Sequence, residues 1–212
     1  MSGKKPFRLW GRASSSNVKK VMWLADEMGL AYERIEAGGK FGVVDTPEYK
    51  KLNPNSRVPT IEDGEFVLWE SNSVMRYLAS KYGGEAFYPT DVAARANIDR
   101  WLDWQLAMLN PVESPVFMGT IRTPPEKQDK AALAAGMEKL MKQWAIVEAQ
   151  LKSRPYMAGD FFSLADIALA IFAHRLLHNP FLTVPPLPNI SAWHARLRPR
   201  PGFKAHVDVP LE

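Results

Sequence analysis

A polar segment, residues 12–17, contains the side chains that are best suited to chemistry. It carries three consecutive serines and lies between a short apolar run and a helical pattern. A serine hydroxyl at the start of a helix can donate to an anion, which the helix dipole also favours. A thiol bound there would ionise more easily, because a hydrogen bond to the charged form lowers its pKa. Ser14, Ser15 and Ser16 all meet this condition, and each could instead serve only as the helix cap.

Glu70 and Ser71 form a second candidate, because they follow one apolar run and open a helical one. Ser71 as a helix cap could present its hydroxyl and nearby N–H groups to a carboxylate, while Glu70 could hold an ammonium group. A zwitterionic amino-acid end would satisfy both residues. The alternative is an ordinary cap with an acidic residue near the helix start, where the dipole favours it.

Val58 and Pro59 form a third candidate, for backbone reasons. A cis bond before Pro59 would turn the main chain of Val58 outward and leave it free to pair with an extended peptide. A single bond before proline is cis in only about 5% of folded cases. Three such signals at successive loops along one edge of a small sheet are stronger together than alone.

The N-terminal elements predicted around these loops form a β-α-β unit. Residues 7–10 are strand-like, and an apolar helical pattern follows from Val18 to Met28 and ends at Gly29. Residues 31–35 give the next strand. The short connections favour parallel strands with a right-handed crossover.

A β-β-α unit is predicted next, after an irregular stretch and a short helix opened by Pro47. Two apolar runs, residues 58–61 and 66–69, flank an Asp-Gly turn and predict a hairpin. A helix follows to about Tyr82 and is closed by Gly83. We therefore expect an α/β domain at residues 1–83.

From Asp91 onward the pattern is helical only, so we expect a linker at residues 84–90 and an all-helical domain at 91–212. One predicted helix opens at the Pro124-Pro125-Glu126 segment and carries a nearly unbroken apolar stripe. Proline-rich joints separate the last pieces. The predicted helices carry Ile98 to Leu109, Leu133 to Leu151, Ser163 to Leu177 and Asn189 to Leu197.

The composition limits the class of protein. Of 212 residues 46% are hydrophobic and 24% are charged, which suits a packed core and argues against disorder. The net charge of +4 comes without a basic run interleaved with aromatics, so no nucleic-acid partner is expected. No apolar window has the length of a membrane span or a signal peptide. We expect a cytoplasmic protein without a membrane partner.

Metal and thiol chemistry are judged from the cysteine and histidine content. The chain has no cysteine, which excludes disulfides, thiolate metal sites and a catalytic thiol. His174 and His178 are four residues apart on a predicted helix, which suits two ligands on one face. No third ligand with matching spacing is apparent, so we expect no metal site.

The candidate segments together resemble the bacterial branch of the cytosolic glutathione transferases, of the type that uses serine. The resemblance covers nearly the whole chain and is closest in kind to an enterobacterial member with haloacetate-type activity. It implies a thioredoxin-like domain (βαβ-ββα) followed by a helical bundle, glutathione as co-substrate, and a homodimer. The matching segments are Leu9–Arg12, Ser15, Asn17–Val21, Asn53-Pro54, Val58–Thr60, Leu68–Asn72, Arg122–Glu126 and Gly159–Ala168.

The resemblance implies roles for the first loop. Ser15 matches the serine that donates to the glutathione sulfur, and Ser14 and Ser16 stand within one residue of it. Arg12 and Asn17 are possible helpers or substitutes.

It also implies how the tripeptide is held. Val58 would pair through its backbone with the cysteinyl part, Pro59 corresponds to a cis-proline, and Glu70 with Ser71 would hold the γ-glutamyl group. Lys40 and Arg57 are alternative partners for the glycyl carboxylate.

The implied reaction is attack by the glutathione thiolate on a small electrophile, in conjugation or reductive dehalogenation. Branches of the family that use a cysteine are excluded, because the chain has none. The electrophile pocket would lie between residues 10–12 and the first long helix of the second domain, with Met108, Phe117 and Met118 as candidate walls. The alternative function is a non-catalytic ligand-binding or regulatory protein of the same fold.

Residues Ser163 to Asp166 resemble the helix-capping box of the same family. Ser163 would bond the backbone N–H of Asp166, whose carboxylate would reach back to the Ser163 N–H. Its predicted role is folding, and losing Asp166 should cost about 1 kcal/mol or more.

Overall fold

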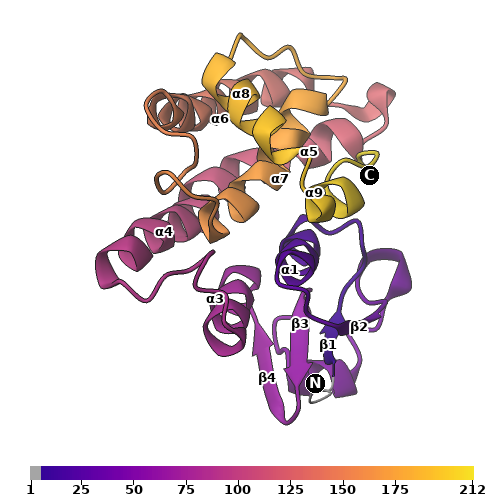
Figure 1. Cartoon of the computed structure of the whole chain (residues 1–212). Coiled ribbons are helices and arrows are strands. Elements are labelled where there is room, and N and C mark those ends of the chain that lie inside the picture. Colours follow the sequence, from indigo (N-terminus) through magenta and orange to yellow (C-terminus); the bar gives the residue numbers. More distant parts are fainter. Residues whose placement is uncertain (1–5) are drawn as a thin grey trace.

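The N-terminal part of the computed structural model, which describes residues 6–212, is a four-stranded mixed sheet with helices (Figure 1). The strands are β1 (Phe7–Trp10), β2 (Tyr32–Ile35), β3 (Thr60–Asp63) and β4 (Phe66–Trp69), in the order β2-β1-β3-β4. β1 runs parallel to β2 and antiparallel to β3, which pairs antiparallel with β4. The predicted crossover unit and hairpin are both confirmed.

Three α-helices and one short 3₁₀ turn complete this part. They are α1 (Ser16–Glu27), the turn η1 (Gly39–Phe41), α2 (Pro47–Leu52) and α3 (Ser71–Tyr82). Pro47 occupies the first helical position of α2, and Gly83 closes α3 in the left-handed conformation. The loops at residues 12–17 and at Glu70 therefore lead into α1 and α3, as predicted, and the loop at Val58 leads into β3.

The rest of the chain is helical, with α4 (Val92–Trp104), α5 (Asn110–Ile121), α6 (Lys130–Leu151), α7 (Leu164–His178), α8 (Pro188–Leu197) and α9 (Pro201–His206). A thioredoxin-like domain followed by a helical domain confirms the predicted fold class. A π-helical turn, η2 (Gln105–Leu109), joins α4 to α5, and a 3₁₀ turn, η3 (Pro125–Lys127), precedes α6. None of the helices within residues 6–212 combines the length and the apolar character needed to cross a membrane.

The helix predicted to open at Pro124 begins only at Lys130, after the separate turn η3. Two further helical features differ from the prediction. The helix predicted to end near Leu109 continues through the π turn into α5, which stays helical although it contains Pro111 and Pro115. Residues 199–201 were predicted to be only a joint, but Pro201 opens α9. Pro201 is suited to this place because the first helical position needs no N–H.

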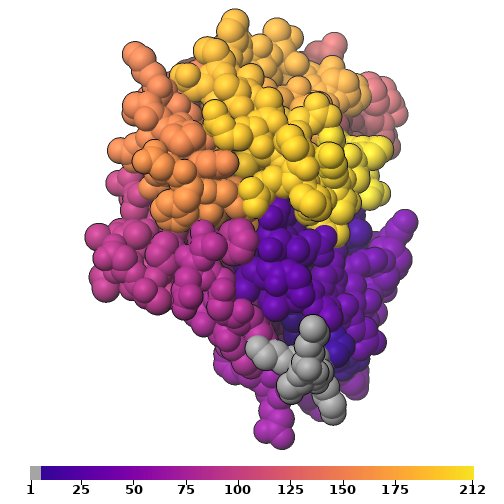
Figure 2. Space-filling view, in the orientation of Figure 1, coloured from indigo at the N-terminus to yellow at the C-terminus, as the bar shows by residue number. Residues whose placement is uncertain are grey.

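α1 is buried on both sides, between the sheet domain and the helical domain. Every residue of α1 from Val18 to Ala25 is buried, because α1 packs against α3 on one side and against α7 and α9 on the other. The Trp23 ring meets Phe203 edge-on at 5.2 Å, and a Cβ on Gly202 would fall 2.4 Å from Trp23. Figure 2 shows the C-terminal segment resting directly on the first helix. The two domains thus share one continuous core.

Candidate active site

A cavity of about 850 Å³ lies where the loops of the sheet domain face α5 and α7. The helical domain contributes mainly apolar and basic side chains to its lining. The sheet domain contributes eight of the nine residues predicted for the site, which are Arg12, Ser15, Asn17, Arg57, Val58, Pro59, Glu70 and Ser71.

Ser15 is the residue before the first turn of α1, and its hydroxyl does not cap the helix. Its backbone is extended, with φ −74° and ψ 121°, and its side chain makes no capping hydrogen bond. Ser16 also lines the cavity, but its hydroxyl accepts a hydrogen bond from Arg175 at 2.9 Å. Ser14 lies outside the cavity lining. The geometry therefore supports Ser15, which the family resemblance indicates, over Ser14 and Ser16.

The main chain next to Val58 is fixed by hydrogen bonds from two buried side chains. The bond between Val58 and Pro59 is cis. The carbonyl of Arg57 accepts hydrogen bonds from the Tyr49 hydroxyl at 2.6 Å and from Asn53 Nδ2 at 2.9 Å. These contacts fix the main chain at the cavity wall, where an extended peptide would have to pair with it.

Glu70 and Ser71 stand at the start of α3. Glu70 has φ +69°, which is uncommon for a residue with a side chain and is found preferentially at functional positions. Ser71 is buried, and its hydroxyl donates to Asn17 Oδ1 at 3.3 Å. The starts of α1 and α3 are therefore linked at the cavity floor.

Lys40 is the one predicted site residue outside the cavity lining. It lies exposed in η1, and its ammonium group sits 5.2 Å from the centre of the Phe41 ring. Arg57, the other predicted partner for a glycyl carboxylate, does line the cavity. Of the predicted pocket walls, Phe117 and Met118 line the cavity, whereas Met108 is exposed elsewhere.

A buried lysine beneath the cavity floor was not predicted. Lys20 of α1 is fully buried, and its ammonium group donates to Gln105 Oε1 at 2.6 Å, Asn72 Oδ1 at 3.0 Å and Ser71 Oγ at 3.4 Å. Burial lowers the pKa of Lys20 to about 7, and the charge of Glu70 opposes this shift. Gln105 comes from the π-helical turn, a feature that often marks functional sites.

The Lys20→Met variant should reveal this lysine through the pH dependence of stability. Unfolded Lys20 stays protonated up to a pKa of about 10.4, whereas the folded group loses its proton near pH 7. Between these values the unfolded state binds more protons, so the wild type gains stability relative to the variant as pH rises. From pH 7 to pH 9 the gain should be about 2 kcal/mol. Urea unfolding of both proteins at several pH values measures it, and parallel curves would contradict it.

A second buried charged residue, Arg175, lines the cavity from the helical domain. Arg175 of α7 pairs with Glu113 of α5 at 3.0 Å, and its guanidinium lies 3.2 Å from the centre of the Phe117 ring. Burial raises the pKa of Glu113 to about 7, against the influence of Arg175. The sequence offered no signal for this pair, since an arginine and a glutamate 62 residues apart form no motif.

Comparison with known proteins identifies the family of this chain. Residues 5–80 match the family described as Glutathione S-transferase, N-terminal domain, and residues 109–201 match Glutathione S-transferase, C-terminal domain. The chain is 38% identical over 205 residues to glutathione S-transferase GstB of Escherichia coli K12, covering 96% of this chain and 98% of that protein. Glutathione S-transferase 3 of Zea mays is 32% identical, covering 97% of this chain and 96% of its own length.

A solved structure is similar over the same length. The theta class glutathione S-transferase of the citrus canker pathogen Xanthomonas axonopodis pv. citri, crystallised with glutathione bound, is 44% identical. It matches with a TM-score of 0.94 and covers 98% of this chain and 100% of that one. With its fold, its cavity and these relatives, the chain belongs to the glutathione S-transferase family of enzymes.

Proposed function

We propose that this protein binds glutathione in the 850 Å³ cavity and activates the thiol for attack on a small electrophile. This proposal rests on Ser15, which lines the cavity at the start of α1 and whose hydroxyl does not cap the helix. The positive end of the α1 dipole and one donated hydrogen bond would both favour thiolate over thiol. A free thiol has a pKa of about 8.5, so a modest shift suffices for ionisation at neutral pH.

The rest of the tripeptide would follow the cavity edge. The Ser71 end of α3 would receive the γ-glutamyl carboxylate, and Glu70 would pair with its ammonium group. The main chain of Val58 would pair with the cysteinyl residue, next to the cis-proline. Arg57 is a better candidate than Lys40 for binding the glycyl carboxylate, because of the two only Arg57 lines the cavity. Arg12 and Asn17 remain candidate helpers of Ser15.

The electrophile is expected to be small and anionic, such as a haloacetate. Arg12 and Arg122 both line the cavity. Burial is the main cause that lowers the pKa of Arg12, the charge of Arg122 adds to this shift, and the charge of Glu212 opposes it. Among residues 6–212, Glu70 is the acidic side chain in the lining. An anion between the two guanidinium groups would relieve their repulsion.

The reaction on such a substrate is a simple displacement. The thiolate sulfur attacks the carbon that carries the halogen, the carbon–sulfur bond forms, and halide leaves with the bonding electrons. The product is the glutathione thioether of acetate, and no oxidant is needed. In reductive dehalogenation a second glutathione thiolate would then attack the thioether sulfur. The carbon–sulfur bond would break, its electron pair would stay on carbon and take up a proton, and the products would be the disulfide and the reduced acid. Bound geometry would supply the proximity that the free reaction lacks.

Arg122→Gln should separate the anionic substrate from a neutral one. A hydrogen bond to a charged group is worth about 1.5–3 kcal/mol, so KM for bromoacetate should rise roughly 10-fold or more. KM for the neutral electrophile chlorodinitrobenzene should change less than about 2-fold, since no charged contact is lost. Lys127→Gln, an exposed cation in η3 outside the cavity, is the matched control. Equal effects on both substrates would contradict an anion site.

The glutathione proposal has its own test. Calorimetric titration with millimolar glutathione should release heat, and glutathione should raise the melting temperature. A panel of electrophiles should show enzyme-dependent loss of thiol. Binding without any turnover would favour a non-catalytic role, and the absence of binding would end the proposal.

We propose three further properties from family membership alone. They are a homodimer in which the sheet domain of one chain faces the helical domain of the other, a cytoplasmic location, and a role in detoxification. Light scattering at micromolar concentration would test the dimer directly.

A further inference from the structure

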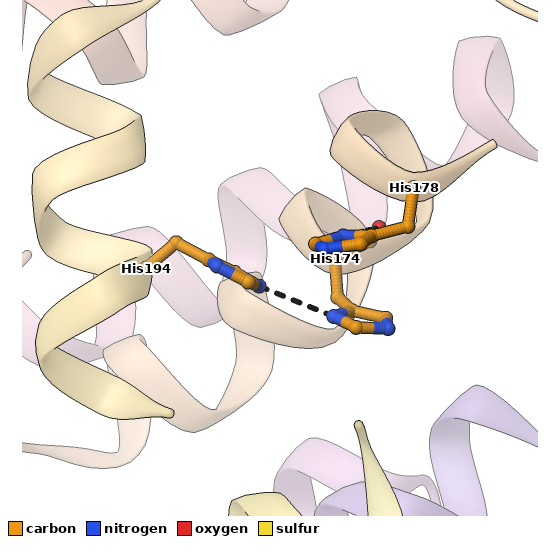
Figure 3. Close-up of side chains that lie close together, drawn as sticks. All are labelled: His174, His178 and His194. Atoms are coloured by element: carbon orange, nitrogen blue, oxygen red, sulfur yellow. Dashed lines mark hydrogen bonds between the residues drawn. The ribbon is translucent and has the colours of Figure 1, made fainter. Parts of the chain in front are cut away.

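Three histidines gather between α7 and α8, away from the glutathione cavity. His174 and His178 come from α7 and His194 from α8, and their candidate ligand nitrogens all lie within 4.8 Å of one another. Figure 3 shows the His194 ring directed toward the stacked rings of His174 and His178. None of the three lines the cavity that contains Ser15. The helix spacing alone predicted two possible ligands, and packing of α8 against α7 supplies the third.

The spacing of two of these nitrogens suits a shared metal ion. His174 Nδ1 and His194 Nε2 are 3.2 Å apart. Two imidazole nitrogens that each bind a tetrahedral zinc ion at about 2.0–2.1 Å lie about 3.3 Å from each other. An ion could therefore replace the hydrogen bond between these rings with little movement of α7 or α8.

The third ring is held in the tautomer that a metal needs. His178 Nδ1 lies 3.1 Å from the carbonyl oxygen of His174, to which it can only donate. The other nitrogen, Nε2, then carries a lone pair, and a hydrogen bond of this kind commonly orients metal-binding histidines. The His178 ring now stacks on that of His174 at 4.1 Å, with an angle of 18° between the planes. It must turn to aim its lone pair at a shared ion. The exposed position permits this turn, in which the ion replaces the stack on His174 and the present hydrogen bond to its carbonyl.

The surroundings shield two of the three rings from solvent. His174 and His194 are buried, and the Phe203 ring packs edge-on against both at 5.8 Å and 5.2 Å. Asp208 is the nearby acidic group that acts on both rings, and its carboxylate is paired with Arg198 at 2.7 Å.

We propose that His174, His178 and His194 form a site for a divalent transition-metal ion of the zinc type, with solvent completing the coordination beside His178. Imidazole ligands suit zinc, nickel and copper, whereas calcium and magnesium prefer oxygen. The bound ion would fasten α8 to α7 within the helical domain. The site is independent of glutathione chemistry, so it stands or falls separately from the proposed function.

The composition of the chain leaves few competing metal ligands in a binding test. The protein has no cysteine and only four histidines, of which His206 lies apart and pairs with Asp26 at 2.7 Å. Untagged, chelator-treated protein is titrated with ZnCl₂ in a calorimeter at pH 7.5. We expect one ion per chain, and a rise in melting temperature that EDTA reverses.

The exposed ligand is the best one to remove, because its loss should not disturb folding. His178→Gln should weaken zinc binding at least 10-fold and abolish the melting shift, while His206→Gln should bind as the wild type does. Copper titration followed by electron paramagnetic resonance should show nitrogen ligation that His178→Gln reduces. No binding to the wild type, or equal binding by both variants, would overturn the site.

Discussion

Replacing Ser15 with alanine should lower glutathione turnover at pH 7 by about 10- to 100-fold, with the protein still folded and still able to bind glutathione. The variant loses one hydrogen bond to a charged sulfur, worth about 1.5–3 kcal/mol. That energy corresponds to a rise of about 1–2 units in the pKa of the bound thiol. Stopped-flow or steady-state rates across pH 6–9 measure the shift.

The shape of the pH profile distinguishes thiol activation from general damage. Because Ser15 acts on ionisation, the profile of the variant should move to higher pH and recover much of its rate near pH 9. Ser14→Ala is the matched control, since Ser14 is one residue away but outside the cavity lining. A Ser15→Ala profile that is lowered equally at every pH would remove the proposed role. In that case Asn17 and Arg12, which also line the cavity, would be examined next.

The helices and strands of the sheet domain could be predicted because local residues set their ends. Gly29, Pro47 and Gly83 stop or start helices through backbone geometry that no distant contact has to supply. The hairpin turn at Gly64 is equally local, with φ +66° at that residue. α9 escaped prediction because six residues are too few for a periodic pattern, and the helix is stabilised by packing on α1.

The candidate site divides in the same way. Its sheet-domain residues belong to loops that lead into α1, β3 and α3, where the local sequence indicates both position and chemistry. Lys20 and His194 could not be found, because each has its partners on other helices. Lys20 reaches Gln105, 85 positions further along the chain, and the burial of α1 on both sides hides it from any amphipathic pattern. His194 joins His174 only through the packing of α8 on α7.

Replacing Asp166 with alanine should have the largest effect on stability among these variants. Asp166 is fully buried at the start of α7, where it completes the predicted capping box with Ser163 at 2.9 Å. The structure adds two contacts that the sequence did not indicate, from the backbone N–H of Met157 and from Trp193 Nε1, at 2.9 Å and 2.8 Å. Its carboxylate therefore joins α7 to the preceding loop and to α8.

The expected cost follows from the donors that are left without a partner. Each buried unsatisfied donor costs about 1–3 kcal/mol, so Asp166→Ala should lose roughly 3–5 kcal/mol of the unfolding free energy. This exceeds the ~1 kcal/mol expected of an isolated helix cap. Urea denaturation measures this loss of unfolding free energy directly.

Asp129→Ala is the control, because it removes an exposed cap at the start of α6. The Asp129 carboxylate accepts a hydrogen bond from the Ala132 N–H, and its loss should cost only about 1 kcal/mol. If both variants lost the same amount, Asp166 would be an ordinary cap and its contacts to Met157 and Trp193 would add nothing. A difference of 2 kcal/mol or more would instead mean that the Asp166 carboxylate stabilises the contact between α7, α8 and the loop that contains Met157.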